Sequence, residues 1–190
     1  GEAFEDTVRI TKEICRAAHF MGIDVESEVG ELSCADISTG TQSPGHDTDV
    51  EQAKYFVEET GIDALAVAIG NIHLLEDAKA QLNYGLLETL RKEIPVPLVL
   101  HGGTGVSAED MKKAIHMGIS KVNVGTVLKR AYIDAVSGFI ASRELEKIDP
   151  HITMGWGGQD DMLSVGRDAV TQKAVEFIDM FGSAGKAGIF

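Results

Sequence analysis

Two histidines and a glutamate in this sequence lie at the ends of short runs that are typical of β-strands. Glu28 lies near the end of the first run, and His73 and His101 follow two later runs. Imidazole and carboxylate groups are common ligands of Zn²⁺ and related divalent ions. A lone histidine after a strand is more often structural, and that alternative stays open for each of them. Taken as a set at one sheet edge, the three residues indicate a divalent-metal site.

Two glycine-containing loops offer backbone N–H groups to an anion. The first, residues 102–105, precedes a helix start at Ser107, and the second, residues 123–126, adds a further N–H group and a hydroxyl. Glycines without a Cβ let consecutive N–H groups converge on a phosphate. Paired loops of this kind after consecutive strands are typical of the phosphate site of an α/β barrel. Two ordinary glycine turns are the alternative.

Lys121 has two interpretations. A lysine on a barrel strand can form a Schiff base with a carbonyl substrate. We expect Lys121 to begin its strand, at the end away from the other polar residues, and therefore to be an ordinary exposed lysine.

The elements that position these residues alternate between strand and helix. Strand-like runs cover residues 23–29, 64–69, 96–100 and 121–124, and helical patterns precede, separate and follow them. The two middle runs are continuously apolar, as in strands covered on both faces. This order predicts a parallel sheet with right-handed crossovers. We expect helices over 8–21, from Thr48 to about 60, from Ser107 to about 118 and over 161–180, with a loop over 144–158.

Composition limits the class of protein. The chain has 190 residues with 17 Lys+Arg and 30 Asp+Glu, a formal net charge of −13. Such acidity argues against nucleic-acid partners and anionic membrane surfaces. No apolar run approaches the roughly 20 residues of a membrane span. The two cysteines form no disulfide framework and the first residues form no signal peptide, so we expect a reduced, cytoplasmic setting.

An ordered set of motifs resembles the class II, metal-dependent ketose-bisphosphate aldolases, which include fructose- and tagatose-bisphosphate aldolases. The motifs cover residues 24–30, 64–73, 98–106, 121–126 and 181–186. The resemblance implies a TIM (β/α)₈ barrel, of which residues 1–190 would supply strands 5–8 as the C-terminal part of one domain. It also implies a homodimer or homotetramer.

The resemblance assigns roles to individual residues. It places His73 and His101 among three histidines on a catalytic Zn²⁺, with Glu28 at an alternative metal position and Asp36 as a proton carrier. Family members usually have Glu where Asp36 stands. The third histidine and an acid/base aspartate belong to a strand that precedes this sequence. The implied substrate contacts are the amides or side chains of Leu74, Gly102, Gly103, Thr104, Asn123, Val124, Gly125 and Thr126. Leu74 stands where the family usually has glycine.

The reaction implied by the resemblance is reversible aldol cleavage of a ketose 1,6-bisphosphate to dihydroxyacetone phosphate and an aldehyde. The metal would act as a Lewis acid that stabilises an enediolate, and the bound phosphate would orient the substrate. The alternative is a non-catalytic phosphosugar-binding or scaffold relative. Four βα units cannot close a barrel alone, so we expect the remaining half to come from a longer chain or a second one, and these residues to expose apolar helix faces.

Overall fold

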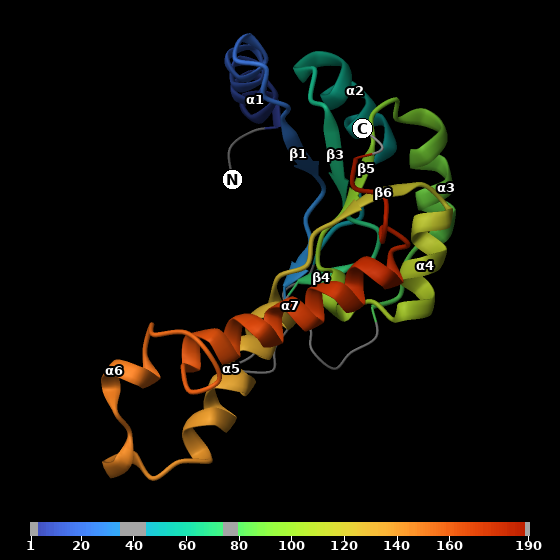
Figure 1. The fold of residues 1–190 in the computed structure, drawn as a ribbon. Helices are drawn as coiled ribbons and strands as arrows, with labels where there is room; N and C mark the ends of the chain where they lie inside the picture. The colour runs from blue at the N-terminus through green and yellow to red at the C-terminus, as the bar shows by residue number, and fades with distance from the viewer. Residues whose placement is uncertain (1–3, 35–44, 74–79, 189–190) are drawn as a thin grey trace. The chain divides into compact units, whose positions relative to one another are not determined.

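The computed structural model describes residues 4–34, 45–73 and 80–188 (Figure 1). The chain divides into two compact units, Gly1–Asn123 and Val124–Phe190. The first unit holds the sheet and the second is helical. Within the described residues, no helix is both long enough and apolar enough to cross a bilayer.

A four-stranded parallel sheet forms the centre of the first unit (Figure 1). Its strands, in spatial order, are β1 (Glu26–Val29), β3 (Ala64–Val67), β5 (Leu98–Leu100) and β6 (Ile119–Val122). The predicted alternation of parallel strands and helices is therefore confirmed. Two further short strands, β2 (Ser33–Cys34) and β4 (Ile72–His73), pair with each other in parallel. They lie just beyond β1 and β3 in the chain and were not predicted.

The core lies along the two middle strands. Leu65 and Val67 on β3, and Leu98 and Leu100 on β5, are all at most 1% exposed. Both faces of these strands are covered, which explains why their sequences are continuously apolar. In contrast, β1 and β6 lie at the two edges of this sheet and carry the polar side chains of the candidate site.

The helices of the first unit are α1 (Phe4–Phe20), α2 (Val50–Thr60), α3 (Tyr84–Glu93) and α4 (Ala108–His116). Two of these, α2 and α4, lie close to their predicted ranges; α1 begins four residues before its predicted start, and no range was predicted for α3. The Asp49 carboxylate caps α2 by accepting from the Gln52 N–H, and Ser107 caps α4 by accepting from the Asp110 N–H. Gly61 ends α2 in the left-handed region with φ 71°.

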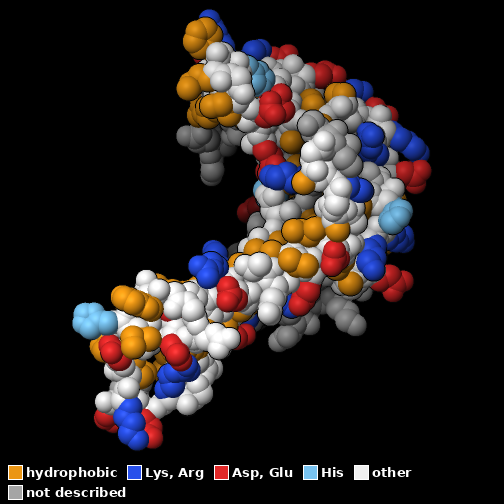
Figure 2. Space-filling model, in the orientation of Figure 1, with side chains coloured by type: hydrophobic (Ala, Val, Ile, Leu, Met, Phe, Trp, Pro, Cys, Tyr) orange, Lys and Arg blue, Asp and Glu red, His pale blue; other side chains and the backbone are white. Residues whose placement is uncertain are grey.

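Helix α1 carries an apolar stripe that the sheet does not cover. Its buried residues are Val8, Thr11 and Cys15, whereas Ile14 is 53% exposed and Met21, just after the helix, is 72% exposed. Phe20 is 93% exposed, and apolar side chains gather over this helix in Figure 2. These side chains therefore form an exposed apolar surface, which is typical of a site where another part of a protein packs.

The second unit is built on two packed helices, α5 (Thr126–Ala141) and α7 (Met162–Met180) (Figure 1). Gly166 lets them approach, because a Cβ there would lie 2.4 Å from the Tyr132 ring. Between them, where we expected only loop, the chain forms a 3₁₀ turn, η2 (Leu145–Lys147), and a short helix, α6 (Pro150–Thr153). The buried Asp161 carboxylate caps α7 and accepts hydrogen bonds from the Gly155 and Gly157 amides.

Asp63 links three segments of the first unit. Its carboxylate makes the stability of the fold depend on pH in the acidic range. Its carboxylate accepts hydrogen bonds from the Val25 N–H at 2.7 Å and from the His19 ring at 2.8 Å. These bonds, that from Val25 foremost, lower the pKa of Asp63. The stabilisation is therefore present above the unfolded-state pKa, about 4, and is lost as pH falls through the lower folded-state pKa.

We expect Asp63→Asn to reduce the free energy of unfolding at pH 6 by less than about 1 kcal/mol, because the carboxylate is partly exposed. The difference from the wild type should shrink as pH falls below about 4. Urea unfolding across pH 3–6 measures both. A difference that stays constant or grows toward pH 3 would contradict this assignment.

Candidate active site

The sheet curls so strongly that its two edge strands meet through side chains. Lys121 Nζ on β6 lies 2.6 Å from Glu26 Oε2 on β1, although β3 and β5 separate the two strands. In a flat sheet three strand spacings of about 4.8 Å would place the edge strands roughly 14 Å apart. The contact therefore indicates a curved wall with a concave polar face, as in a barrel.

His101, the first residue after β5, lies between two carboxylates on this concave face. Its Nδ1 is 2.8 Å from Glu28 Oε2, and its Nε2 is 3.0 Å from Glu26 Oε1. The hydrogen bond with Glu28 is the main reason that the pKa of His101 is raised; burial opposes the rise and Glu26 adds to it. The structure thus brings together two of the predicted metal ligands, Glu28 and His101.

Glu26 is the residue that joins this cluster to β6. Besides His101, its carboxylate accepts hydrogen bonds from Lys121 and, at 3.3 Å, from Asn123 Nδ2. Burial opposes its ionisation, but the bonds from Lys121 and His101 outweigh burial and lower the pKa of Glu26. Glu26 was given no role in the sequence analysis. Its alternation with Glu28 was the available signal, because residues two apart share one face of a strand.

Lys121 does not lie where the sequence reasoning placed it. It is the third residue of the four-residue strand β6, and its Nζ reaches the site through Glu26. The prediction that it lies at the far end is wrong, because β6 begins two residues earlier, at Ile119, than the apolar pattern suggested. Its side chain is 56% exposed, so the expected exposure holds.

Asn71 fixes the position of the His101 backbone. Asn71 was given no role in the sequence analysis. It is 2% exposed; its Nδ2 donates to the His101 carbonyl at 2.9 Å and its Oδ1 accepts from the Ile69 N–H at 2.7 Å. A buried amide that bonds two loop backbones holds them together. Because Asn71 lies two residues before His73, this bond also brings the backbone of β4 close to the end of β5.

The predicted phosphate loop follows His101 directly. Gly102 has φ 67°, a left-handed conformation that favours glycine, and a 3₁₀ turn, η1 (Gly103–Gly105), leads into helix α4. Gly103 is buried against β6, where an added Cβ would lie 2.9 Å from Val122 Cγ1. The turn and the helix start beyond it form the kind of backbone arrangement that binds phosphate.

The second predicted phosphate segment is divided between the two units. Asn123 ends the first unit, and its N–H donates to the Leu100 carbonyl at 2.9 Å. Val124, Gly125 and Thr126 open the second unit, where Gly125 precedes α5 and its carbonyl accepts from the Leu128 and Lys129 amides. Gly125 provides no side-chain cap for the N-terminus of α5.

Three predicted site residues are only partly described or lie outside the described residues. Asp36 and Leu74 lie outside them. His73 is described at the backbone, as the second residue of β4, where it pairs with Cys34. The role of its imidazole, and a cation shared with His101, stay predictions.

The donor chemistry at His101 fits a divalent metal ion. Among the side chains that the structure describes, no group of three His, Cys, Asp or Glu residues is arranged to hold an ion. The pair His101 and Glu28 nevertheless supplies one imidazole nitrogen and one carboxylate within 2.8 Å of each other, which suits Zn²⁺. The second ring nitrogen contacts Glu26, and ligating histidines commonly bond a carboxylate in this way.

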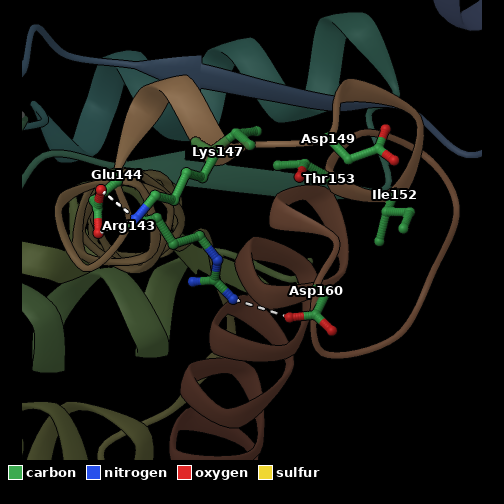
Figure 3. Close-up of a pocket in the computed structure, with 8 residues that line it drawn as sticks. Arg143, Glu144, Lys147, Asp149, Ile152, Thr153 and Asp160 are labelled. Carbon is green, nitrogen blue, oxygen red and sulfur yellow. Dashed lines mark hydrogen bonds and ion pairs between the residues drawn. The ribbon is translucent and has the colours of Figure 1, made fainter.

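A surface pocket in the second unit has different chemistry (Figure 3). The Arg143 guanidinium reaches Asp160 at 3.1 Å, and Lys147 pairs with Glu144 at 2.8 Å. Because both cations are paired with carboxylates, this pocket offers no unpaired positive charge from these two side chains to a phosphate.

Comparisons with known proteins agree with the fold. A sequence profile described as class-II fructose-bisphosphate aldolase matches residues 1–186. The protein YdjI of Escherichia coli K12, which is named as uncharacterized, is 39% identical over 184 residues, which are 97% of this chain and 61% of YdjI. Fructose-bisphosphate aldolase of Geobacillus stearothermophilus is 34% identical over 184 residues, 97% of this chain and 60% of that enzyme.

Solved structures of similar fold also include aldolases. The crystal structure of the YdjI aldolase from E. coli K12 has a TM-score of 0.73 and 38% identity, covering 98% of this chain and 59% of that one. A putative fructose-1,6-bisphosphate aldolase from Coccidioides immitis has a TM-score of 0.75 and 28% identity, covering 100% and 62%.

This chain belongs to the class II fructose-bisphosphate aldolase family. Members of that family are generally metal-dependent. The predicted family and fold class are confirmed: the four-stranded parallel sheet with its helices is consistent with part of a TIM barrel. The chain spans about 60% of the length of the relatives described above.

Gly103 gives a test of how closely the phosphate loop packs. We expect Gly103→Ala to lower the free energy of unfolding by about 1–3 kcal/mol, because its Cβ would meet Val122 and, at 3.3 Å, Met111. Gly125→Ala is the matched control, since nothing lies within 4 Å of a Cβ there. Urea unfolding of both variants measures the difference, and equal stability of the two would contradict the packing described.

Proposed function

We propose that the protein bearing these residues catalyses metal-dependent, reversible aldol cleavage of a ketose 1,6-bisphosphate to dihydroxyacetone phosphate and an aldehyde. The observation that carries the proposal is the position of His101. It faces Glu28 at 2.8 Å, and the next residue begins the glycine turn suited to a phosphate. A metal ligand and a phosphate cradle thus adjoin in one chain segment.

His101, with Glu28 beside it, would hold the ion together with His73, and Zn²⁺ suits this donor set. When bound, such an ion supplies Lewis-acid polarisation of a substrate carbonyl. The amides of Gly102, Gly103 and Thr104 would bind one substrate phosphate and so fix the distance between that phosphate and the carbonyl.

The remaining predicted groups complete the proposal. Asn123 donates to Glu26 on the concave face, and we propose that it and the amides of Val124, Gly125 and Thr126 add phosphate or hydroxyl contacts. Asp36 would carry the proton and Leu74 would offer its amide. The exposed apolar face of α1 supports the further proposal that another part of a longer chain, or another subunit of a dimer or tetramer, covers it. Intact mass and sedimentation separate these two cases.

Chelation tests the proposal. The protein, at its natural full length, is assayed for cleavage of fructose and tagatose 1,6-bisphosphates before and after EDTA treatment. We expect EDTA to abolish cleavage and added Zn²⁺ to restore it. Cleavage that survives complete metal removal would contradict the metal-dependent mechanism. Phosphosugar binding with no turnover at any metal load would support a non-catalytic phosphosugar-binding relative instead.

A Schiff-base mechanism through Lys121 is disfavoured by its partner. The Lys121 ammonium lies 2.6 Å from the Glu26 carboxylate, and an ammonium held in an ion pair has no lone pair for attack on a carbonyl. Borohydride in the presence of substrate should therefore leave Lys121 unmodified. Covalent trapping of substrate on Lys121 would overturn this reading.

A further inference from the structure

The carboxylate of Glu26 connects three residues that come from different parts of the sheet. Its Oε1 contacts His101 Nε2 at 3.0 Å and Asn123 Nδ2 at 3.3 Å, and its Oε2 contacts Lys121 Nζ at 2.6 Å. Both oxygens of Glu26 thus have cationic or amide partners, which fix the position of the carboxylate.

The two ring nitrogens of His101 therefore have different surroundings. Nε2 faces Glu26, which Lys121 and Asn123 hold in place from β6 and the residues after it. Nδ1 faces Glu28, the carboxylate that is itself a candidate metal ligand. In a neutral imidazole one nitrogen carries the proton and the other offers the lone pair. A fixed carboxylate at Nε2 favours the proton there, so that the Nδ1 lone pair is available to a cation that also contacts Glu28.

We propose that Glu26 and Lys121 are positioning residues of the metal site: Lys121 holds Glu26, and Glu26 holds the His101 ring so that Nδ1 binds a divalent cation beside Glu28. The inference rests on the proposed metal-dependent function and deepens it. In this role Lys121 needs its positive charge and the length of its side chain, but it does not contact the substrate.

The charges of the cluster support this arrangement. Two carboxylates, Glu26 and Glu28, would bracket one imidazole, and the Lys121 ammonium neutralises the one that is not expected to bind the ion. Without that ammonium, Glu26 would be an unneutralised carboxylate only partly exposed to water, at 24%. Glu26 would then move toward the metal or rotate away from Nε2. In either case the His101 ring would lose the contact that fixes its orientation.

The test measures Zn²⁺ affinity in the absence of substrate, by competition with a chromophoric chelator. Outer partners of ligating histidines typically change metal affinity by about 10–100-fold when they are replaced. We expect Lys121→Met and Glu26→Gln each to weaken Zn²⁺ binding within that range. Lys121→Arg, which keeps the charge, should recover part of the loss. Lys92→Met is the control, because Lys92 pairs with Glu88 on the exposed face of α3.

A second measurement needs no variant and reports the ring directly. In protein with ¹⁵N-labelled histidine, long-range ¹H–¹⁵N spectra of the Zn²⁺-loaded state should show the His101 proton on Nε2 and the metal on Nδ1. Metal bound through Nε2, or unchanged Zn²⁺ affinity in both Lys121→Met and Glu26→Gln, would overturn the inference. A wild-type protein that binds no Zn²⁺ would instead overturn the proposed function itself, so the two failures are distinguishable.

Discussion

Replacing His101 with alanine is expected to lower kcat/KM for ketose-bisphosphate cleavage by about 10³-fold or more. The variant removes a candidate metal ligand, and Lewis-acid stabilisation by a bound ion is worth several kcal/mol in the transition state, at 1.36 kcal/mol for each factor of ten. It also removes the ring that Glu26 and Glu28 both contact. Steady-state kinetics of the full-length protein with and without added Zn²⁺ measure the loss.

His116→Ala is the matched control. The His116 ring lies on the exposed face of α4, where its Nδ1 contacts the Lys112 carbonyl of the same helix. We expect this variant to retain wild-type kinetics. A His101→Ala protein that is folded, binds Zn²⁺ as tightly as the wild type and cleaves substrate at a comparable rate would rule out the assigned role of His101.

Replacing Asn71 with leucine is expected to lower the free energy of unfolding by about 3 kcal/mol. Leucine has the same number and branching of side-chain heavy atoms but cannot bond the Ile69 N–H or the His101 carbonyl, and each buried backbone group left without a partner costs about 1–3 kcal/mol. Because the same bond fixes the backbone of His101, cleavage should fall as well. Urea unfolding measures the first effect and kinetics below the unfolding transition measure the second.

Asn83→Ala provides the comparison for stability. Asn83 caps α3 at the surface by accepting from the Leu86 N–H, and loss of such a cap typically costs about 1 kcal/mol. If Asn71→Leu destabilises the protein no more than Asn83→Ala does, the buried amide is not the tether described here.

Much of the fold could be predicted from local sequence signals. The caps at Asp49 and Ser107 and the left-handed glycine at Gly61 mark helix ends through bonds made within a few residues. The strands β3 and β5 can be recognised in the sequence because burial on both faces requires apolar residues throughout. The short pair β2 and β4 was missed, because two-residue strands have no pattern of their own and depend on their partner.

The candidate site was predictable in its chain positions but not in its contacts. Glu28 and His101 were selected because parallel strands bring their carboxyl ends to one edge, and the structure places them 2.8 Å apart. The link from Lys121 to Glu26 joins residues 95 positions apart and depends on curvature of the whole sheet. Likewise, the bond from Asn71 to the His101 carbonyl depends on loop packing. Local periodicity contains neither kind of information.

Anomalous X-ray diffraction at the zinc edge, on crystals of the full-length protein grown with Zn²⁺, tests the metal site most directly. We expect one strong peak about 2.0–2.1 Å from a ring nitrogen of both His73 and His101, next to the Gly102–Gly105 turn. Zinc found elsewhere, or two rings too far apart to share one ion, would contradict it.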